Sequence, residues 1–353
     1  SMSITTHERP GVYSSYGASS LIRGSGGRKT VGLVAVNTKA TAKTVYTITS
    51  YEEAVTTFGS AGGQDMAELI RVILLNGAAA VAAVPIAAST DYEAGFAVLE
   101  GQENVSVVVC DSTTQTDQQD LRDSVAAASA ARRERIAVVG GAASETVTNL
   151  ISRAAALNSE RVVLVAPGGT DEDGTALSGL TAAAAVAGAI AAQSDPALPL
   201  SGAELTGLHG LSQQYNDNDI DLLVRGGVTP LESVAGVVSV VRGITTRTTT
   251  GESPDTTWRE LSTILIVDDV IPSIRESLRA KFRRAKNTEQ SRGAIRSQVI
   301  LELESKLSRE IITGYEHVTV SADTENPTVC LVEFSFTVAH GLNQIWLTAS
   351  ITI

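Results

Sequence analysis

Blocks of apolar residues alternate with blocks of helical spacing through the middle of the chain. Four apolar runs are continuous, without a polar residue at every second position: 78–86, 105–110, 136–139 and 161–166. Strands with this pattern are buried on both faces, as in a parallel sheet covered by helices on its two sides. The stretches with helical spacing between and after these runs cover 91–99, 118–133, 145–157 and 180–193. Residues 28–200 are therefore predicted to form an α/β body with a mainly parallel sheet.

The last third of the chain has a different pattern. Residues 272–286 and 293–312 have helical spacing, and 262–270 is an apolar strand or the start of a helix. Beyond them apolar residues alternate with polar ones, which is typical of a strand with one buried face. That face carries Val332, Phe334, Phe336 and Val338. Residues 201–340 are therefore predicted to form an α+β domain.

Two acidic residues and a proline stand at the predicted start of the first of these helices. Pro272 suits the first turn of a helix, because its missing N–H is not needed there. Asp268 and Asp269 precede it, where they either cap the helix or carry out acid–base chemistry. On the following helix Glu302 and Lys306 are spaced to pair on the surface.

Both ends of the chain have the character of extended β-arms. Residues 1–27 combine an extended stretch from Pro10 to Ile22 with a glycine-rich hinge, and 341–353 alternate apolar and polar residues. A terminal strand must pair within its own subunit or add to the sheet of another chain, and the pattern leaves both alternatives open. If each arm meets a different surface on a neighbouring copy, the contact is heterologous and repeats into rings or helical filaments.

The arm residues expected in strands are Val12, Tyr13, Tyr16, Leu21, Ile22, Ile345, Leu347, Ile351 and Ile353. The expected hinges are Gly24, Gly26, Gly27 and Gly341.

Charge is distributed unevenly along the chain. The 353 residues carry a net charge of −12, which argues against a general nucleic-acid binder, because such proteins neutralise phosphates with clustered positive charge. Residues 272–296 nevertheless hold eight basic and two acidic side chains. This segment either faces an acidic partner or is a solvated helix face.

Cysteine content and hydropathy restrict the compartment. Cys110 and Cys330 lie in apolar runs, which predicts buried free thiols and no disulfide framework. The sequence has no apolar run of about 18 residues that would cross a bilayer, and its first residues do not resemble a secretion signal. We therefore expect assembly in the cytoplasm and no direct membrane insertion.

Enzyme motifs are incomplete in this sequence. The glycine-rich stretch at 24–30 lacks the glycine directly before lysine that a phosphate-binding loop needs. There is no nucleophile elbow, and the four histidines lack metal-ligand spacing. We therefore expect no catalytic residue, no cofactor and no metal. The alternative is a soluble α/β enzyme, a hydrolase or nucleotide-binding protein, with its site at the carboxyl ends of the strands near Gly140 or Gly168.

Several short motifs resemble, in their order and spacing, one known family. They are HERPGVY at 7–13, GGVTPL at 226–231, VVRGITT at 240–246, the stretches 251–255, 264–268 and 281–287, and HGLNQI at 340–345. This series resembles the contractile tail sheath proteins of bacteriophages, a family shared with R-type bacteriocins and related contractile injection systems.

The resemblance implies a structural motor rather than an enzyme. Subunits of such a sheath stack as rings around an inner tail tube, and the terminal arms of neighbours add strands to a four-stranded sheet in a third subunit. Contraction is then a rigid-body rearrangement that drives the tube through the target envelope. The implied partners are further copies of the chain, the inner tube protein, and baseplate and tail terminator proteins. The resemblance also implies assembly in the bacterial cytoplasm, followed by release as part of a virion tail or bacteriocin particle.

The same resemblance implies that a helix of the C-terminal part faces the tube. The helix at 272–286 is the candidate, because its basic side chains suit an acidic tube. The residues expected to face the tube are Arg275, Arg279, Lys281, Arg283 and Lys286.

Overall fold

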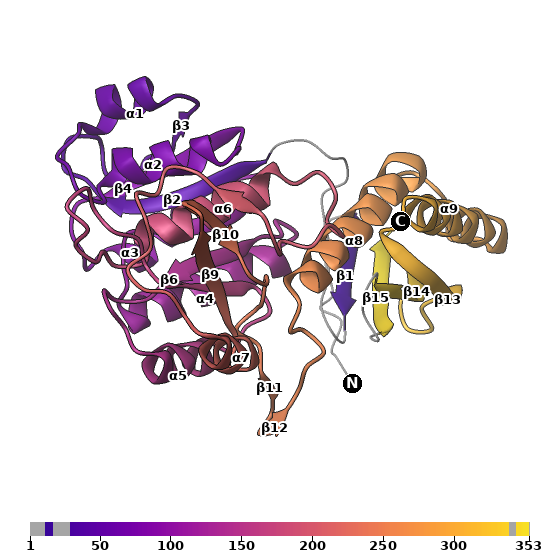
Figure 1. Ribbon diagram of the computed structural model, residues 1–353. Helices are drawn as coiled ribbons and strands as arrows, with labels where there is room; N and C mark the ends of the chain where they lie inside the picture. Colours follow the sequence, from indigo (N-terminus) through magenta and orange to yellow (C-terminus); the bar gives the residue numbers. More distant parts are fainter. Residues whose placement is uncertain (1–10, 17–28, 339–343, 353) are drawn as a thin grey trace. The chain divides into compact units, whose positions relative to one another are not determined.

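The computed structural model describes residues 11–16, 29–338 and 344–352, which form two compact units (Figure 1). The first unit, here called the body, comprises 29–194 and 198–261. The second, the terminal unit, comprises 11–16, 195–197, 262–338 and 344–352. The boundary expected near residue 200 differs from this division, because the sheet of the body continues beyond it.

The body is built on a nine-stranded sheet with the order β3-β4-β2-β5-β6-β7-β9-β10-β8. Its strands are β2 (Thr30–Val36), β3 (Tyr46–Ile48), β4 (Ala80–Ile86), β5 (Val105–Cys110), β6 (Ile136–Gly140), β7 (Val162–Ala166), β8 (Glu204–Leu205), β9 (Val228–Val234) and β10 (Val237–Val240). Neighbouring strands from β4 through β9 are parallel, and β3, β10 and β8 pair antiparallel at the two edges. The predicted mainly parallel sheet is therefore confirmed.

Helices cover both faces of this sheet. They are α1 (Tyr51–Phe58), α2 (Met66–Leu75), α3 (Tyr92–Glu100), α4 (Gln115–Ala130), α5 (Val147–Leu157), α6 (Leu180–Ala192) and α7 (Asp217–Arg225). Helices α2 and α6 pack together on one face, and α3, α4, α5 and α7 form a row on the other (Figure 1). Every residue of β6 and β7 is buried, which explains why these strands are continuous apolar runs. A short hairpin of β11 (Thr249–Thr250) and β12 (Ser253–Pro254) lies outside this sheet.

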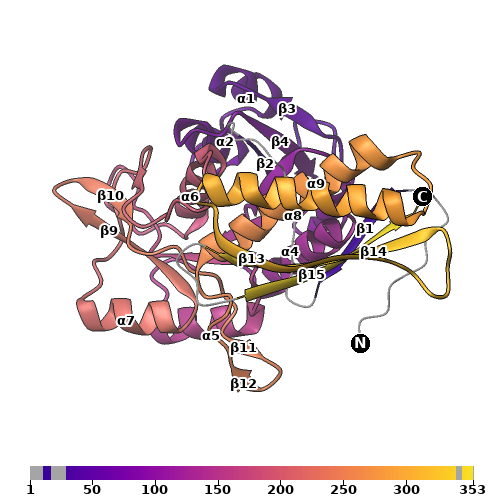
Figure 2. The same ribbon diagram turned by 90° about the vertical axis from the view of Figure 1, so that its right-hand side faces the viewer.

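The terminal unit packs two helices and an antiparallel sheet. The elements are β1 (Gly11–Tyr16), α8 (Leu261–Phe282), α9 (Glu289–Ser308), β13 (Ile312–Ala322), β14 (Val329–Val338) and β15 (Gln344–Thr352). The sheet has the order β1-β15-β14-β13, and helix α9 packs against β13 (Figure 2). Val332, Phe334, Phe336 and Val338 are all fully buried on one face, as their alternation predicts.

Helix α8 corrects two expectations. It runs without interruption from Leu261 to Phe282, so Pro272 lies inside the helix and not in its first turn. Apolar residues at helical spacing continue on both sides of the proline, and burial of that face outweighs the missing N–H. The hydroxyl of Ser273 donates to the carbonyl of Asp269 at 2.8 Å, one turn earlier.

The acidic residue Asp269 is an interior helix residue rather than a cap. Its Oδ2 atom accepts a hydrogen bond from Nζ of Lys306 at 2.7 Å, and the two side chains are 9% and 4% exposed. Lys306 therefore pairs across to α8, and the predicted surface pair with Glu302 is wrong. Glu302 instead accepts a hydrogen bond from Gln298 of its own helix at 3.3 Å. This buried ion pair fixes α9 against α8.

Candidate functional site

The two terminal strands complete the four-stranded sheet within a single chain. Strand β15 pairs antiparallel with β14 from Val329↔Thr352 to Thr337↔Gln344, and β1 pairs with β15 from Gly11↔Thr352 to Tyr16↔Leu347 (Figure 2). The first of the two alternatives left open by the sequence, pairing within the same subunit, is the one seen in this single chain. Strand β15 therefore adds to β14, and β1 adds in turn to β15.

The buried face of β15 continues the core of the unit. Leu347 lies opposite Phe334, Ala349 opposite Val332 and Ile351 opposite Cys330, and all six side chains are at most 5% exposed. Burying a side chain such as Leu347 or Ile351 contributes about 1.5–3 kcal/mol. These two predicted arm residues are therefore placed to hold the arm on β14.

The remaining predicted arm residues give less information. Val12, Tyr13, Tyr16 and Ile345 lie in strands β1 and β15, and only their backbone is described. Leu21, Ile22 and Ile353, and the expected hinges Gly24, Gly26, Gly27 and Gly341, lie outside the described residues.

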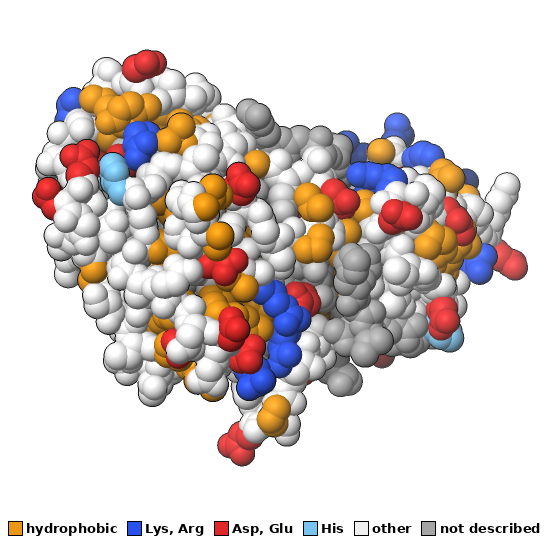
Figure 3. All heavy atoms as spheres, in the orientation of Figure 1, with side chains coloured by type: hydrophobic (Ala, Val, Ile, Leu, Met, Phe, Trp, Pro, Cys, Tyr) orange, Lys and Arg blue, Asp and Glu red, His pale blue; other side chains and the backbone are white. Residues whose placement is uncertain are grey.

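A cluster of exposed basic side chains forms a second feature of the terminal unit. We call it the basic turn, and it consists of Arg279, Lys281, Arg283, Arg284 and Lys286. Helix α8 ends at Phe282, so the last three of these residues lie in the connection to α9. Lys and Arg side chains gather over the joined ends of α8 and α9 in Figure 3. Positive charge at the end of α8 is also favourable for its dipole.

Arg275 differs from the other residues expected to face a tube. It lies in the middle of α8 and is only 9% exposed. It faces inward because it shares a face with the apolar residues Ile271, Ile274 and Leu278, each at most 2% exposed. The exposed basic surface therefore begins at Arg279, one helical turn later.

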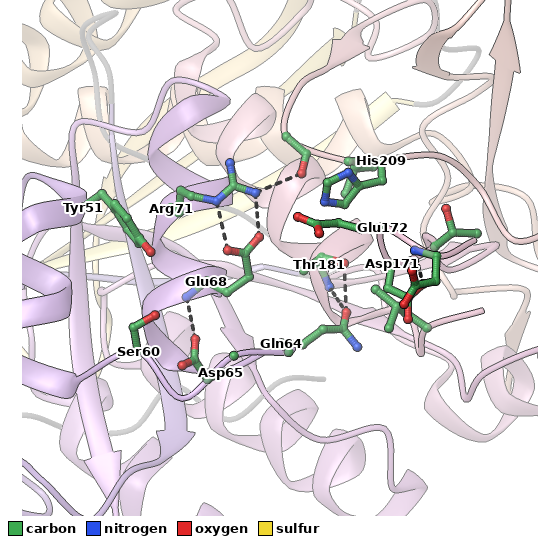
Figure 4. Close-up of a pocket in the computed structure, with 17 residues that line it drawn as sticks. Tyr51, Ser60, Gln64, Asp65, Glu68, Arg71, Asp171, Glu172, Thr181 and His209 are labelled. Atoms are coloured by element: carbon green, nitrogen blue, oxygen red, sulfur yellow. Dashed lines mark hydrogen bonds and ion pairs between the residues drawn. The ribbon is translucent and has the colours of Figure 1, made fainter. Parts of the chain in front are cut away.

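The body contains a polar cavity of about 580 Å³ at the start of α2 (Figure 4). Its acidic groups largely serve the local backbone. Asp65 caps α2 by accepting from the N–H of Glu68 at 2.9 Å, and Asp171 accepts from the N–H groups of Asp173 and Thr175. Glu68 forms two hydrogen bonds with Arg71, and these raise the pKa of the guanidinium.

The other groups of the cavity do not complete a catalytic set. Figure 4 shows His209 and Glu172 on the side of the cavity opposite Tyr51. Gln64 spans its floor, where its Oε1 accepts from the backbone N–H and hydroxyl of Thr181 at 2.9 and 2.8 Å. No nucleophile lies hydrogen-bonded to a base among the described residues of this cavity.

The strand ends near Gly140 and Gly168 offer little space. The hollow beside Gly141 and Gly168 measures about 10 Å³, enough for one water molecule. A Cβ atom on Gly140 would lie 2.2 Å from the carbonyl oxygen of Gly179, and one on Gly168 would lie 2.3 Å from that of Leu177. Glycine at these positions therefore allows close backbone packing, and the location expected for an enzyme site is filled.

Within 11–16, 29–338 and 344–352, no three His, Cys, Asp or Glu side chains are grouped so that they could hold a metal ion. Of the helices described, none combines the length and the apolar character needed to cross a bilayer. Cys110 and Cys330 are free and buried, as predicted, and burial raises the pKa of the Cys110 thiol to about 12.

Solved structures share this architecture. The sheath tail protein of Desulfitobacterium hafniense is 13% identical with a TM-score of 0.76, covering 97% of this chain and 100% of that one. The sheath tail protein of Listeria innocua is 14% identical with a TM-score of 0.72, covering 94% and 96%. The helical sheath of the anti-feeding prophage in its contracted state is 14% identical with a TM-score of 0.69, covering 97% and 96%. At these identities the likeness establishes the fold.

Sequence comparison identifies the family. The tail sheath protein of Bacillus phage SP01 is 31% identical over 225 residues, which cover 61% of this chain and 37% of that protein, so the chain spans well under half of that relative's length. A model of the phage tail sheath protein central domain matches residues 87–246, and a model of the phage tail sheath C-terminal domain matches residues 253–352. Because these two models together match most of the chain, it belongs to the phage tail sheath protein family.

Proposed function

We propose that the chain is a structural subunit of a contractile tail sheath, which polymerises around an inner tube by exchanging terminal strands between copies. The observation that carries this proposal is the four-stranded sheet, in which β15 adds to β14 and β1 adds in turn to β15. β1 pairs only with β15 among the described strands, so the two arms form one separable layer of the sheet.

Exchange of β15 between copies preserves most of the contacts of the sheet. The ladder between β14 and β15 joins nine residue pairs through backbone groups, and the same ladder forms when β15 comes from a second copy. The buried positions of Leu347 and Ile351 are also conserved in such an exchange. The balance between the closed and the exchanged form then depends on protein concentration and on the segments that join the arms to the rest. Gly24, Gly26, Gly27 and Gly341 are the hinges that we propose for these segments.

Contraction is proposed to be a rearrangement of folded subunits. Subunits that keep their fold and their exchanged strands can move as rigid bodies between two packings. A net gain of about 1–3 kcal/mol per subunit, the scale of a few hydrogen bonds, sums over the assembly. The extended state then persists because of a kinetic barrier.

The basic turn is proposed to contact an acidic surface of the inner tube. Its five exposed charges make this contact sensitive to salt, since exposed charges are screened within about 10 Å at 0.1 M ionic strength. Buried Arg275 takes no part in this contact. Baseplate and tail terminator proteins are the proposed partners at the two ends of the polymer, and the bacterial cytoplasm is the proposed place of assembly.

Strand exchange can be tested by a disulfide that forms only between copies. Cys330 lies directly opposite Ile351 in the sheet, and antiparallel neighbours are close enough for a disulfide. One variant carries Ile351→Cys together with Cys330→Ala, and it is mixed with the unaltered chain before assembly. We expect oxidation of the assembled polymer at alkaline pH, where the Cys330 thiol with its burial-raised pKa ionises, to give covalent dimers joined at 330 and 351.

The control uses the same mixture kept monomeric by dilution, which gives no dimers. A second control carries Ile351→Cys with Cys330 retained, and its disulfide within one chain proves that the pair can be oxidised. If the polymer of the mixture stays free of dimers while this control is oxidised, each arm pairs only with its own chain and the proposed exchange is wrong.

A further inference from the structure

We propose that Asn287 is a positioning residue that couples the basic turn to β14, the strand that receives β15. This inference rests on the proposed function. Asn287 follows Lys286 directly and precedes Thr288, which caps α9 by accepting from the N–H of Ser291 at 3.1 Å. It therefore lies at the point where the basic turn ends and α9 begins.

The side chain of Asn287 forms hydrogen bonds with β14, with the turn that precedes it and with α9. Its Nδ2 group donates to the carbonyl oxygens of Pro327 at 2.8 Å and Val329 at 3.3 Å. Its Oδ1 atom accepts from Nη1 of Arg292 at 2.8 Å and from the thiol of Cys330 at 2.9 Å. The partners are 40 and more residues away on the β14 side and five residues away on α9, so one amide joins three elements.

The contacts of Asn287 lie beside the last residues of β15. Val329 is opposite Thr352 of β15, and Cys330 is opposite Ile351. Thr352 is in turn opposite Gly11, the first residue of β1. The amide of Asn287 thus holds the basic turn to the place where the last residues of β15 pair with the first residue of β1.

This placement has a consequence for tube binding. A basic turn that is fixed on β14 presents its charges in one arrangement and loses little conformational freedom on contact with a tube. A turn without this attachment must be ordered at the moment of binding. Coupling of this kind is reciprocal, so contact with the tube also stabilises the end of the arm on β14.

The test compares full-length chains carrying Asn287→Ala, Asn287→Asp or Asn326→Ala. The Asp variant has the size of asparagine and keeps the acceptor for Arg292 but cannot donate to Pro327 and Val329. Asn326 is the matched control, because its Oδ1 accepts only from the backbone N–H and hydroxyl of Thr328 in the β13–β14 turn. Two quantities are measured for each chain: self-assembly without tubes, and co-sedimentation with purified inner tubes of the same tail at fixed salt.

We expect both Asn287 variants to self-assemble as the unaltered chain does and to bind tubes about fivefold more weakly, the effect of one or two lost hydrogen bonds. Hydrogen exchange should quicken at 283–292 and at 329–331 together, whereas Asn326→Ala should change exchange only near 323–329. The coupling is wrong if both Asn287 variants bind tubes as tightly as the unaltered chain does. It is also wrong if they lose self-assembly and tube binding in parallel.

A further variant separates this inference from the proposed function. The double charge reversal Arg283→Glu and Lys286→Glu removes the proposed tube contact itself. If it weakens tube binding while the Asn287 variants do not, only the coupling is wrong. If the charge reversal leaves tube binding unchanged, the tube contact is wrong and the coupling falls with it.

Discussion

The sheet of the body is built largely from successive stretches of the chain, whereas the sheet of the terminal unit joins the first described strand to the last. In the body sheet, the parallel strands from β4 to β9 are enclosed by helices on both faces. The two edges of this sheet are the short strands β3 and β8, of three and two residues. In the terminal sheet, the added layer of β1 and β15 comes from the two ends of the chain. A short edge protects a sheet from further strand addition, and a terminal strand invites exchange.

This difference predicts separate tasks for the two regions. Between the two edges of the body sheet each strand is paired on both sides, so we expect that replacing one of them requires unfolding of the body. The terminal sheet pairs β15 and β1, the last and the first of the described strands. We therefore expect changes in the arm to affect assembly and changes in the body to affect folding.

The largest expected effect follows from removing residues 343–353. We expect the shortened chain to keep the helical circular dichroism of the body and to lose polymerisation completely. Without β15 no copy can add a strand to the β14 of another copy. Electron microscopy of the full-length and shortened chains at equal concentration measures this loss.

A pair of single substitutions sharpens the same test. Leu347 is 2% exposed and Thr348 lies on the opposite face of β15. Leu347→Asp should prevent polymerisation as the deletion does, and Thr348→Asp should have a much smaller effect. Loss of the body's helical signal in the shortened chain would mean that the arm belongs to the folding core, and the two regions would not have separate tasks.

The next largest effect concerns the buried ion pair of the terminal unit. Lys306→Met leaves Asp269 buried without its charged partner, and we expect the free energy of unfolding to fall by about 3–5 kcal/mol. Trp346 in β15 reports this unfolding by fluorescence when Trp258 of the body is changed to Phe.

The control is an exposed ion pair of the body. Arg133 and Glu103 are 34% and 63% exposed, so Arg133→Met should cost less than about 1 kcal/mol. The double variant Asp269→Leu with Lys306→Met should recover much of the lost stability. A cost for Lys306→Met as small as that for Arg133→Met would show that Asp269 is solvated in the folded chain.

The sequence predicts which segments form strands more accurately than it predicts which distant residues meet in the folded chain. The run at 105–110 coincides with β5, because a continuous β-branched run is buried on both faces wherever it lies. The predicted position of Pro272 in a first turn is wrong, because a proline is also tolerated inside a helix when the residues around it are deeply buried. The pairing of Lys306 with Asp269 joins residues 37 apart, and helical spacing within α9 carries no sign of it.

The candidate site is also predictable only in part, because its long-range pairings leave no sign in the sequence. Alternation identified the faces of β14 and β15, but an alternating pattern is the same whether a strand pairs with its own chain or with another. Asn287 received no role, because its partners Pro327 and Val329 become neighbours only when the β13–β14 turn folds back on α9. The basic cluster was visible as charge, yet only the fold separates buried Arg275 from the exposed residues that follow it.

The smallest expected effect is a pH dependence of the body. Burial raises the pKa of Asp111, whose Oδ2 accepts from the N–H of Val36 at 3.0 Å and whose other oxygen accepts from the hydroxyl of Tyr92. The folded chain therefore holds this proton to higher pH than the unfolded chain does. Stability contributed by the protonated carboxyl is present below the ordinary carboxyl pKa of about 4 and is lost as pH rises through the raised value.

Asp111→Asn removes this titration. We expect the stability of the variant relative to the unaltered chain to increase from about pH 4 towards neutrality, by less than the loss in Lys306→Met, since one pKa unit corresponds to about 1.4 kcal/mol. Denaturation is followed through Trp258 of the body, with Trp346 changed to Phe. The terminal unit, followed through Trp346, should show no such difference between the two chains. A relative stability that falls with pH would mean that the Asp111 carboxylate is stabilised in its charged form, because the hydrogen bonds from Val36 and Tyr92 would then outweigh its burial.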